Sequence, residues 1–238
     1  AGRRAVHSGG SFANAGSHRC SARVRLGQRI EFLVVEKVCA AARAVEERHL
    51  PVRLHALQLV VDDGAQGRHA DATAAYMAVV PYYNKPTQEG IYRHYASLAD
   101  TIDKPLLMYN VPGRTVADML PETVARLARH GNIFGVKEAT GDIDRLKAIQ
   151  ALVDEDFVLY SGDDFTALPF IERGGHGVVT VSGNVVPRQM SLLCSLAGSG
   201  QSAAAKGLDD TLQPLNKMLF VESNPIPVKW ALGEMGLL

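Results

Sequence analysis

The chain has 238 residues, of which 47% are hydrophobic, and its 25 basic side chains balance 25 acidic ones. This length allows one large domain or two small ones, and the neutral charge gives no reason to expect nucleic acid as a partner. Three widely spaced cysteines without CxxC spacing argue against a disulfide framework or a zinc site and fit a reducing, cytoplasmic compartment, and no apolar run is long enough to span a membrane.

The composition of the chain changes sharply near residue 72. Residues 1–30 contain six arginines and no acidic residue, and no threonine precedes Thr73. An acid-free, arginine-containing start is typical of a transit peptide. A shifted reading frame of GC-rich DNA would also give such a segment, and we favour this frame error because the anomalous residues occupy space that the fold needs. Within the region, propensity predicts a helix over 29–49 and a strand over 57–61.

From residue 74 onward, short apolar runs alternate with helical segments, which indicates parallel βαβ units. Asp142, followed by Leu146 and Ile149, predicts a capped amphipathic helix. The predicted strands lie at 74–83, 104–113, 132–141, 157–164 and 176–184. The predicted helices lie between them at 88–103, 120–130, 142–153 and 164–173, and after the last strand at 187–198, 202–221 and 226–236.

Continuous apolar strands are buried on both faces, as in a doubly wound sheet or a closed barrel. No GxGxxG motif follows a strand, so dinucleotide binding has no support. Polar residues instead follow successive strands, at the edge where a (β/α)8 TIM barrel has its active site. We therefore predict an α/β chain with three parts: an anomalous region over 1–72 in which barrel strands are missing, a barrel part over 73–185, and a helical appendage over 186–238.

Lys137 ends the apolar run 133–136 within the predicted strand over 132–141, and a lysine there either reaches water or uses its amine. Burial at a barrel mouth would lower its pKa, and from about 10.4 a drop of ~2–3 units leaves some free amine near neutral pH. A free amine forms a Schiff base with a ketone, which makes the neighbouring carbon acidic. Lys137 thus predicts aldol-type carbon–carbon chemistry, unless it is an ordinary surface residue.

Other polar residues lie at the same predicted edge. Tyr109 could shuttle protons beside a Schiff-base lysine or could be an interfacial aromatic, and Arg114 could clamp a carboxylate or pair with a loop acid. The pair Tyr82-Tyr83 is too polar for a core and too aromatic for an ordinary loop, which fits an interface. Asp163-Asp164 is a weak metal candidate, since two carboxylates after a strand more often cap the next helix; we predict no metal or cofactor. The edge as a whole predicts an active site.

Six segments stand in order along the chain: PYYNKPTQEGIY (81–92), YNVPGRT (109–115), GVKEATG (135–141), YSGDD (160–164), GGHGVVTVSGNVVP (174–187) and FVESNPIPVKWALGEMGL (220–237). They resemble the dihydrodipicolinate synthase (4-hydroxy-tetrahydrodipicolinate synthase) family from about residue 73 to the end, whereas the N-terminal third does not match. The resemblance implies a (β/α)8 barrel with C-terminal helices that condenses pyruvate with aspartate 4-semialdehyde in lysine and diaminopimelate biosynthesis.

The same resemblance implies catalytic roles for three residues. Lys137 would form the Schiff base with pyruvate, and Tyr109 would be the proton donor and relay. Tyr83 would reach into the active site of a neighbouring subunit. The enzyme would then be a homo-oligomer, at least a dimer and usually a homotetramer built as a dimer of dimers.

Three further residues receive binding roles from the resemblance. Arg114 would hold the carboxylate of the semialdehyde, and the backbone of Val179 would line the pyruvate pocket. Tyr82 would lie near an allosteric site for the feedback inhibitor lysine.

The chain departs from the family in its upstream part. The family carries a Gly-Thr-Thr-Gly-Glu stretch whose threonines bind the pyruvate carboxylate and complete the relay, and no residue before Thr73 can take those roles. Family members also extend beyond the position of Leu238. Two alternatives therefore stay open: a sibling pyruvate-dependent aldolase, such as an N-acetylneuraminate lyase or a keto-deoxy sugar acid aldolase, and a truncated relative with weak activity or none.

Overall fold

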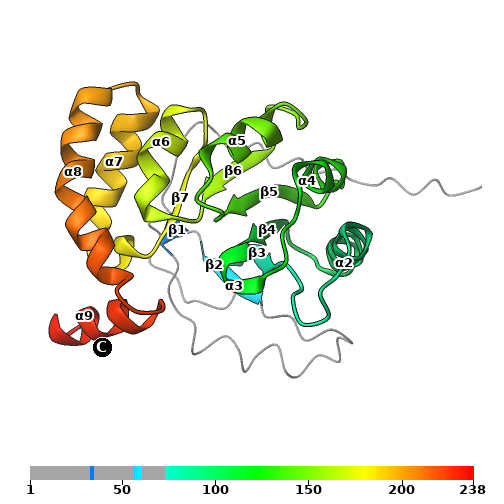
Figure 1. Cartoon of the computed structure of the whole chain (residues 1–238), viewed down its shortest axis with the longest axis horizontal. Helices are drawn as coiled ribbons and strands as arrows, with labels where there is room; N and C mark the ends of the chain where they lie inside the picture. Colours follow the sequence, from blue (N-terminus) through cyan, green and yellow to red (C-terminus); the bar gives the residue numbers. More distant parts are fainter. Residues whose placement is uncertain (1–32, 35–55, 61–72) are drawn as a thin grey trace, which may run out of the picture.

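The computed structural model describes residues 33–34, 56–60 and 73–238. A seven-stranded sheet with the order β1-β7-β6-β5-β4-β3-β2 forms its centre, and helices lie around the outside (Figure 1). Strands β3 to β7 pair with one another in parallel and alternate with helices, which confirms the predicted βαβ units of a partial (β/α)8 barrel. The strands are β1 (Leu33–Val34), β2 (Ala56–Val60), β3 (Thr73–Val79), β4 (Leu106–Asn110), β5 (Ile133–Glu138), β6 (Val158–Ser161) and β7 (Gly177–Thr180).

The helices of the described chain follow the predicted order, and α7 and α8, which come after β7, pack together with α6 at one side of the sheet (Figure 1). None of the described helices has the length and apolar character that crossing a bilayer requires. The helices are α2 (Gln88–Thr101), α3 (Pro112–Thr115), α4 (Pro121–Ala128), α5 (Ile143–Gln150), α6 (Ala167–Glu172), α7 (Pro187–Gly198), α8 (Ser202–Leu219) and α9 (Ile226–Glu234), with 3-10 turns η1 (Asp164–Thr166) and η2 (Ser182–Asn184).

Helix α5 shows how the local sequence sets these elements. The Asp142 side chain accepts a hydrogen bond from the backbone N–H of Asp144 at 2.9 Å, which satisfies one of the free donors at the start of the helix. Leu146 and Ile149 are fully buried on the face that packs against the sheet. The predicted capped amphipathic helix is therefore confirmed.

The region before residue 73 differs from prediction in two respects. Leu33 and Val34 lie within the predicted helix over 29–49 but form β1, parallel to β7, so the helix prediction is wrong there. The predicted strand near 57–61 is confirmed as β2, yet it runs antiparallel to β3, unlike the strands of a closed barrel. An antiparallel pair needs only a short connection, whereas a parallel pair needs a crossover. The remaining residues of 1–72, on which the predicted frame error depends, lie outside the described residues, and that prediction stays open.

Side chains alternate between the two faces of the sheet because successive strand residues point in opposite directions. Met108, Val136 and Leu159 belong to the main core cluster, which packs the outer face of the sheet against the helices. Val179 and Tyr160 belong to a smaller cluster on the inner face. Most of the apolar packing of the sheet therefore lies on its outer face, and the inner face has room for the side chains of the site described below.

Close strand packing leaves no room for a side chain at Gly135 of β5. A Cβ atom built there would lie 2.4 Å from the carbonyl oxygen of Val158 and 2.9 Å from its Cβ. Gly207, in the middle of α8, has no atom within 4 Å of a Cβ built in the same way. The two glycines therefore differ in whether the fold needs them.

We expect Gly135→Ala to lower the free energy of unfolding by roughly 1–3 kcal/mol through overpacking. Gly207→Ala should instead raise it by ~0.5–1 kcal/mol, because alanine loses less backbone entropy in a helix. Urea denaturation of the two variants and the unmodified chain measures both effects. Equal stabilities for the two variants would contradict the strand packing described above.

Candidate active site

The carboxyl ends of three neighbouring strands bring a row of side chains together on the inner face. Tyr109 of β4 is the register partner of Lys137 of β5, and Lys137 is the partner of Tyr160 of β6. Register partners on parallel strands point to the same face. The predicted residues Tyr109 and Lys137 are thus neighbours, and Tyr160 extends the row.

Lys137 is buried in spite of its charge, with a relative exposure of 8%. Its Nζ atom lies over the Tyr109 ring, 4.0 Å from the ring centroid, where the negative face of the ring attracts a cation. A Cβ at Gly162 would lie 2.9 Å from the Cε of Lys137 and 2.6 Å from the Cβ of Ala139, so the missing side chain makes room for the lysine stem. The alternative interpretation, that Lys137 is an ordinary surface residue, is therefore wrong for this chain.

The pKa of Lys137 is lowered to about 8, chiefly because burial penalises the ammonium form. The negative charge of Asp164 opposes this shift, and the positive charge of Arg114 adds to it. At neutral pH a usable fraction of the side chain is a free amine, which is the nucleophilic form.

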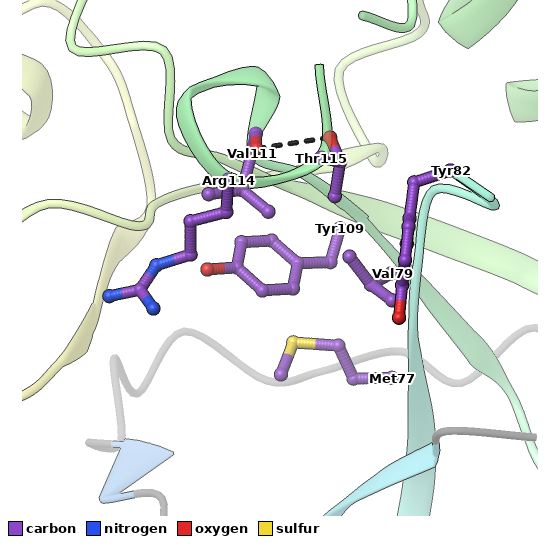
Figure 2. A pocket seen from close by; sticks show the side chains of 7 residues that line it. All are labelled: Met77, Val79, Tyr82, Tyr109, Val111, Arg114 and Thr115. Carbon is purple, nitrogen blue, oxygen red and sulfur yellow. Dashed lines mark hydrogen bonds between the residues drawn. The ribbon is translucent and has the colours of Figure 1, made fainter. Parts of the chain in front are cut away.

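Tyr109 borders a cavity of about 440 Å³ at the end of β4. In the view of Figure 2 its ring lies above the Met77 side chain, and its hydroxyl points toward the Arg114 guanidinium. Burial raises the pKa of Tyr109, and the charge of Arg114 partly offsets the rise, so the phenol remains a proton donor at neutral pH. Lys137 is not part of the cavity wall, but Tyr109 contacts both. The cavity is lined by Met77, Val79, Tyr82, Tyr109, Val111, Arg114 and Thr115.

Arg114 lies on the single turn of α3, directly after β4. Pro112 occupies the first turn of α3, and the Thr115 hydroxyl closes it by donating to the Val111 carbonyl at 3.1 Å. The exposed guanidinium donates to the backbone carbonyl of Asn224 at 3.2 Å. It pairs with no acidic side chain among the residues that the structure describes, so within this part of the chain its other donors are available at the edge of the cavity.

The remaining predicted residues are not all brought to this row. Val179 is buried on the inner face of β7. Tyr82 is 47% exposed and lines the cavity, whereas the Tyr83 side chain is 96% exposed. This chain by itself does not bury Tyr83 beside Tyr109.

The two aspartates after β6 have separate structural partners. Asp163 accepts from the Phe165 N–H at 3.2 Å and caps η1, which confirms the capping interpretation for this residue. Asp164 is 1% exposed, and its Oδ2 accepts from the N–H groups of Val181 at 2.9 Å and Ser182 at 3.0 Å. Among the described residues, no group of three acidic, histidine or cysteine side chains is arranged to hold a metal ion.

Sequence reasoning gave no role to Tyr160 or to Asp164 as a charge near Lys137. Tyr160 is half-buried in the same row, and burial raises its pKa. It lies four residues before the end of its predicted strand, as Tyr109 and Lys137 do in theirs, and this shared position is the signal that could have identified it. Asp164 gave no such signal, because its proximity to Lys137 depends on contacts between separate strands.

The dihydrodipicolinate synthetase family model matches residues 61–238. The chain belongs to this family. The match begins somewhat before the motifs that first suggested it and includes β3 to β7 with all the helices of the described chain. The prediction of the family is thus confirmed.

Similar proteins of this family support the assignment. A 4-hydroxy-tetrahydrodipicolinate synthase of Psychromonas ingrahamii is 57% identical over 172 residues, which are 72% of this chain and 59% of that protein. One of Methylococcus capsulatus is 50% identical over 206 residues, 87% of this chain and 69% of that protein. An alignment of that length must begin at or before residue 33.

A solved structure is similar in fold as well as in sequence. The chloride-inhibited dihydrodipicolinate synthase of Acinetobacter baumannii, complexed with pyruvate, is 47% identical and superimposes with a TM-score of 0.68. The match covers 70% of this chain and 57% of that one. This chain thus spans less than two thirds of the length of this structure and of the Psychromonas relative.

The burial of Lys137 predicts a stability cost that depends on pH. Its folded pKa of about 8 lies below the ordinary value of 10.5, so the unfolded chain binds more protons between these values, and stability from this group rises with pH there. We expect Lys137→Met to stabilise the fold by up to ~3 kcal/mol below pH 8. The gain should disappear as the pH approaches 10.5.

Denaturant unfolding at several pH values between 7 and 10.5 measures this difference directly. Lys147→Met, which removes an exposed lysine from α5, is the matched control. A Lys137→Met variant no more stable than the unmodified chain at pH 7 would show that the buried amine costs nothing.

Proposed function

We propose that this chain carries the imine-forming site of a 4-hydroxy-tetrahydrodipicolinate synthase, which condenses pyruvate with aspartate 4-semialdehyde in lysine and diaminopimelate biosynthesis. The observation that carries the proposal is the buried Lys137 amine, with its pKa lowered to about 8, 4.0 Å above the Tyr109 ring. Membership of the family and the names of its similar members support this choice of substrates.

The proposed chemistry begins with attack of the neutral Lys137 amine on the ketone carbon of pyruvate. The carbonyl oxygen leaves as water when Tyr109 supplies a proton, which gives a protonated imine. The imine withdraws electrons from the methyl carbon, which loses a proton to form an enamine. The enamine carbon then adds to the aldehyde carbon of the semialdehyde, whose oxygen takes up a proton, so one carbon–carbon bond forms. Lys137 and Tyr109 are the catalytic residues that act in these steps.

Two residues receive substrate-binding roles. The Arg114 guanidinium borders the cavity at the Tyr109 hydroxyl (Figure 2), and its planar pair of donors suits the carboxylate of the semialdehyde. Val179 lies on the inner face of β7, and we assign its backbone to the pyruvate pocket. The cavity would then hold aspartate 4-semialdehyde, and the strand ends would hold pyruvate.

The proposal extends to assembly and regulation. The 96% exposure of the Tyr83 side chain suits a catalytic role across a subunit interface, in a cytoplasmic homo-oligomer. Tyr82 would lie near a lysine-binding site. These assignments stay predictions, as do the division of the chain near residues 72 and 185 and the absence of a cofactor.

Two other functions remain as alternatives. A sibling pyruvate-dependent aldolase would share Lys137 and Tyr109 but take a different aldehyde, and a catalytically inactive relative would form no imine. Arg114 favours the synthase, because its guanidinium suits the carboxylate of aspartate 4-semialdehyde. An aldehyde that carries no carboxylate would gain nothing from this residue.

The first test is reduction of the imine by borohydride in the presence of pyruvate, followed by intact mass and peptide mapping. We expect one reduced pyruvate adduct, on Lys137, which reaches half its maximal rate of formation near pH 8 because the amine must be free. Lys137→Met should form none. Folded protein without an adduct would favour the inactive relative, and an adduct on another lysine would contradict the proposed site.

A second test separates the synthase from its siblings. Arg114→Met should raise the KM for aspartate 4-semialdehyde by about 10- to 100-fold, because the loss of a charge-assisted hydrogen bond weakens binding by that factor. The same variant should still form the reduced pyruvate adduct. Arg114→Lys should give a smaller loss, because it keeps the charge but not the paired donors. An unchanged KM for both variants, measured in steady-state assays, would favour another aldehyde.

A further inference from the structure

Four polar side chains, two of them almost fully buried, form a network on the outer face of the strand ends, opposite the proposed site. They are Asn110, Asp118, Glu138 and Arg145, which we name the strand-end network. Asn110 and Glu138 are register partners, as Tyr109 and Lys137 are one residue earlier. Each strand therefore ends in one residue directed to the site and one directed to the network.

The network joins β4 to β5 by direct side-chain contacts. The Asn110 amide nitrogen Nδ2 donates to Glu138 Oε2 at 3.1 Å and, with longer geometry, to Oε1 at 3.4 Å. Glu138 Oε1 also accepts from the Thr140 N–H at 2.9 Å, which holds the loop after β5. Side chains thus add to the backbone ladder that joins Tyr109 and Lys137.

The same network holds the segment that follows Arg114. Asn110 Nδ2 donates to Asp118 Oδ1 at 2.9 Å, and Asn110 Oδ1 accepts from the Met119 N–H at 3.0 Å. Arg145 of α5 pairs with Asp118 and lies 3.9 Å from Glu138 Oε2. Asn110, which precedes α3, is thus bonded to Asp118 and Met119, which follow it. These bonds fix the chain at both ends of the α3 turn.

Such a network is a poor source of stability. Asn110 and Glu138 are almost fully buried, and burial raises the pKa of Glu138, although hydrogen bonds from Asn110 and the charge of Arg145 oppose the rise. Buried ion pairs often contribute less to stability than well-packed apolar side chains of similar size. Their directional bonds, however, define the relative positions of the groups that they join.

We propose that the strand-end network is a positioning device for the imine-forming site, which sets the distance of the Lys137 amine from Tyr109 and the orientation of the Arg114 turn. The inference rests on the proposed function for the reaction that it serves. A shift of β4 along β5 would move Tyr109 and Lys137 apart, and misplacement by about 1 Å can reduce a rate ~100-fold. Asn110, Asp118, Glu138 and Arg145 are positioning residues in this account and do not touch substrate.

The test compares Glu138→Gln with the unmodified chain in the pyruvate–borohydride reaction. The glutamine keeps the size of Glu138 and the bond from Thr140 but turns an amide donor toward the donors of Asn110 and Arg145. At saturating pyruvate we expect the trapping rate to fall by roughly 10- to 100-fold. The pyruvate concentration that gives half the maximal rate should change much less.

Arg145 provides a second variant and a conservative rescue. Arg145→Met should reproduce the loss of rate, and Arg145→Lys should restore part of it by returning a charge near Asp118 and Glu138. Glu89→Gln is the matched control, because Glu89 pairs with Arg93 and Arg126 in an exposed cluster on α2 and α4. Its trapping rate should equal that of the unmodified chain.

A readout without substrate separates this inference from the proposed function. The pH dependence of Lys137 acetylation, followed by peptide mapping, reports the pKa of the amine in any folded variant. If the strand ends loosen in Glu138→Gln and Arg145→Met, water should reach the Lys137 amine and stabilise its charged form. The pH at which acetylation is half-maximal should then rise from about 8 toward 10.5. Unchanged midpoints in folded variants would overturn the positioning role, even if the unmodified chain forms no pyruvate adduct. Unchanged trapping rates in those variants would overturn it equally.

Discussion

The burial of one ammonium group at the end of β5 is the constraint on which the rest of this site depends. Lys137 is 8% exposed, and its lowered pKa means that the fold opposes its charged form. The chain accommodates it through specific features: Gly162 leaves space for the stem, and the Tyr109 ring faces the amine. The packing of the helices against the outer face supplies the stability that such a group takes away.

The alternation of side chains in parallel strands allows the sheet to serve two purposes at one edge. Tyr109 and Lys137 point inward, whereas their neighbours Asn110 and Glu138 point outward, and backbone register aligns both pairs. A change of register by one residue would exchange the two sets. Chemistry and positioning are therefore coupled by the backbone, and neither can be altered along these strands without affecting the other.

Much of this architecture could be predicted from local patterns, because apolar runs, Asp142 as a cap and polar strand ends depend on neighbouring residues alone. Features that depend on distant contacts could not. Leu33 and Val34 have helical surroundings in sequence but pair with β7, and the antiparallel direction of β2 is set by its partner. In the sequence, Asp118 resembles a solvated loop acid, and its ion pair with Arg145 depends on the packing of α5 beside it.

The electrostatic surroundings of Lys137 match the change of charge in the proposed reaction. Burial and the cationic Arg114 favour the neutral amine that attacks the ketone, but the imine that follows carries a positive charge in the same place. The carboxylate of Asp164, held by the N–H groups of Val181 and Ser182, opposes the cost of that charge, as does the face of the Tyr109 ring. A fully apolar pocket would lower the pKa of the amine further and would also destabilise the cationic imine. The opposed charges of Arg114 and Asp164 thus keep both states of the lysine accessible near neutral pH.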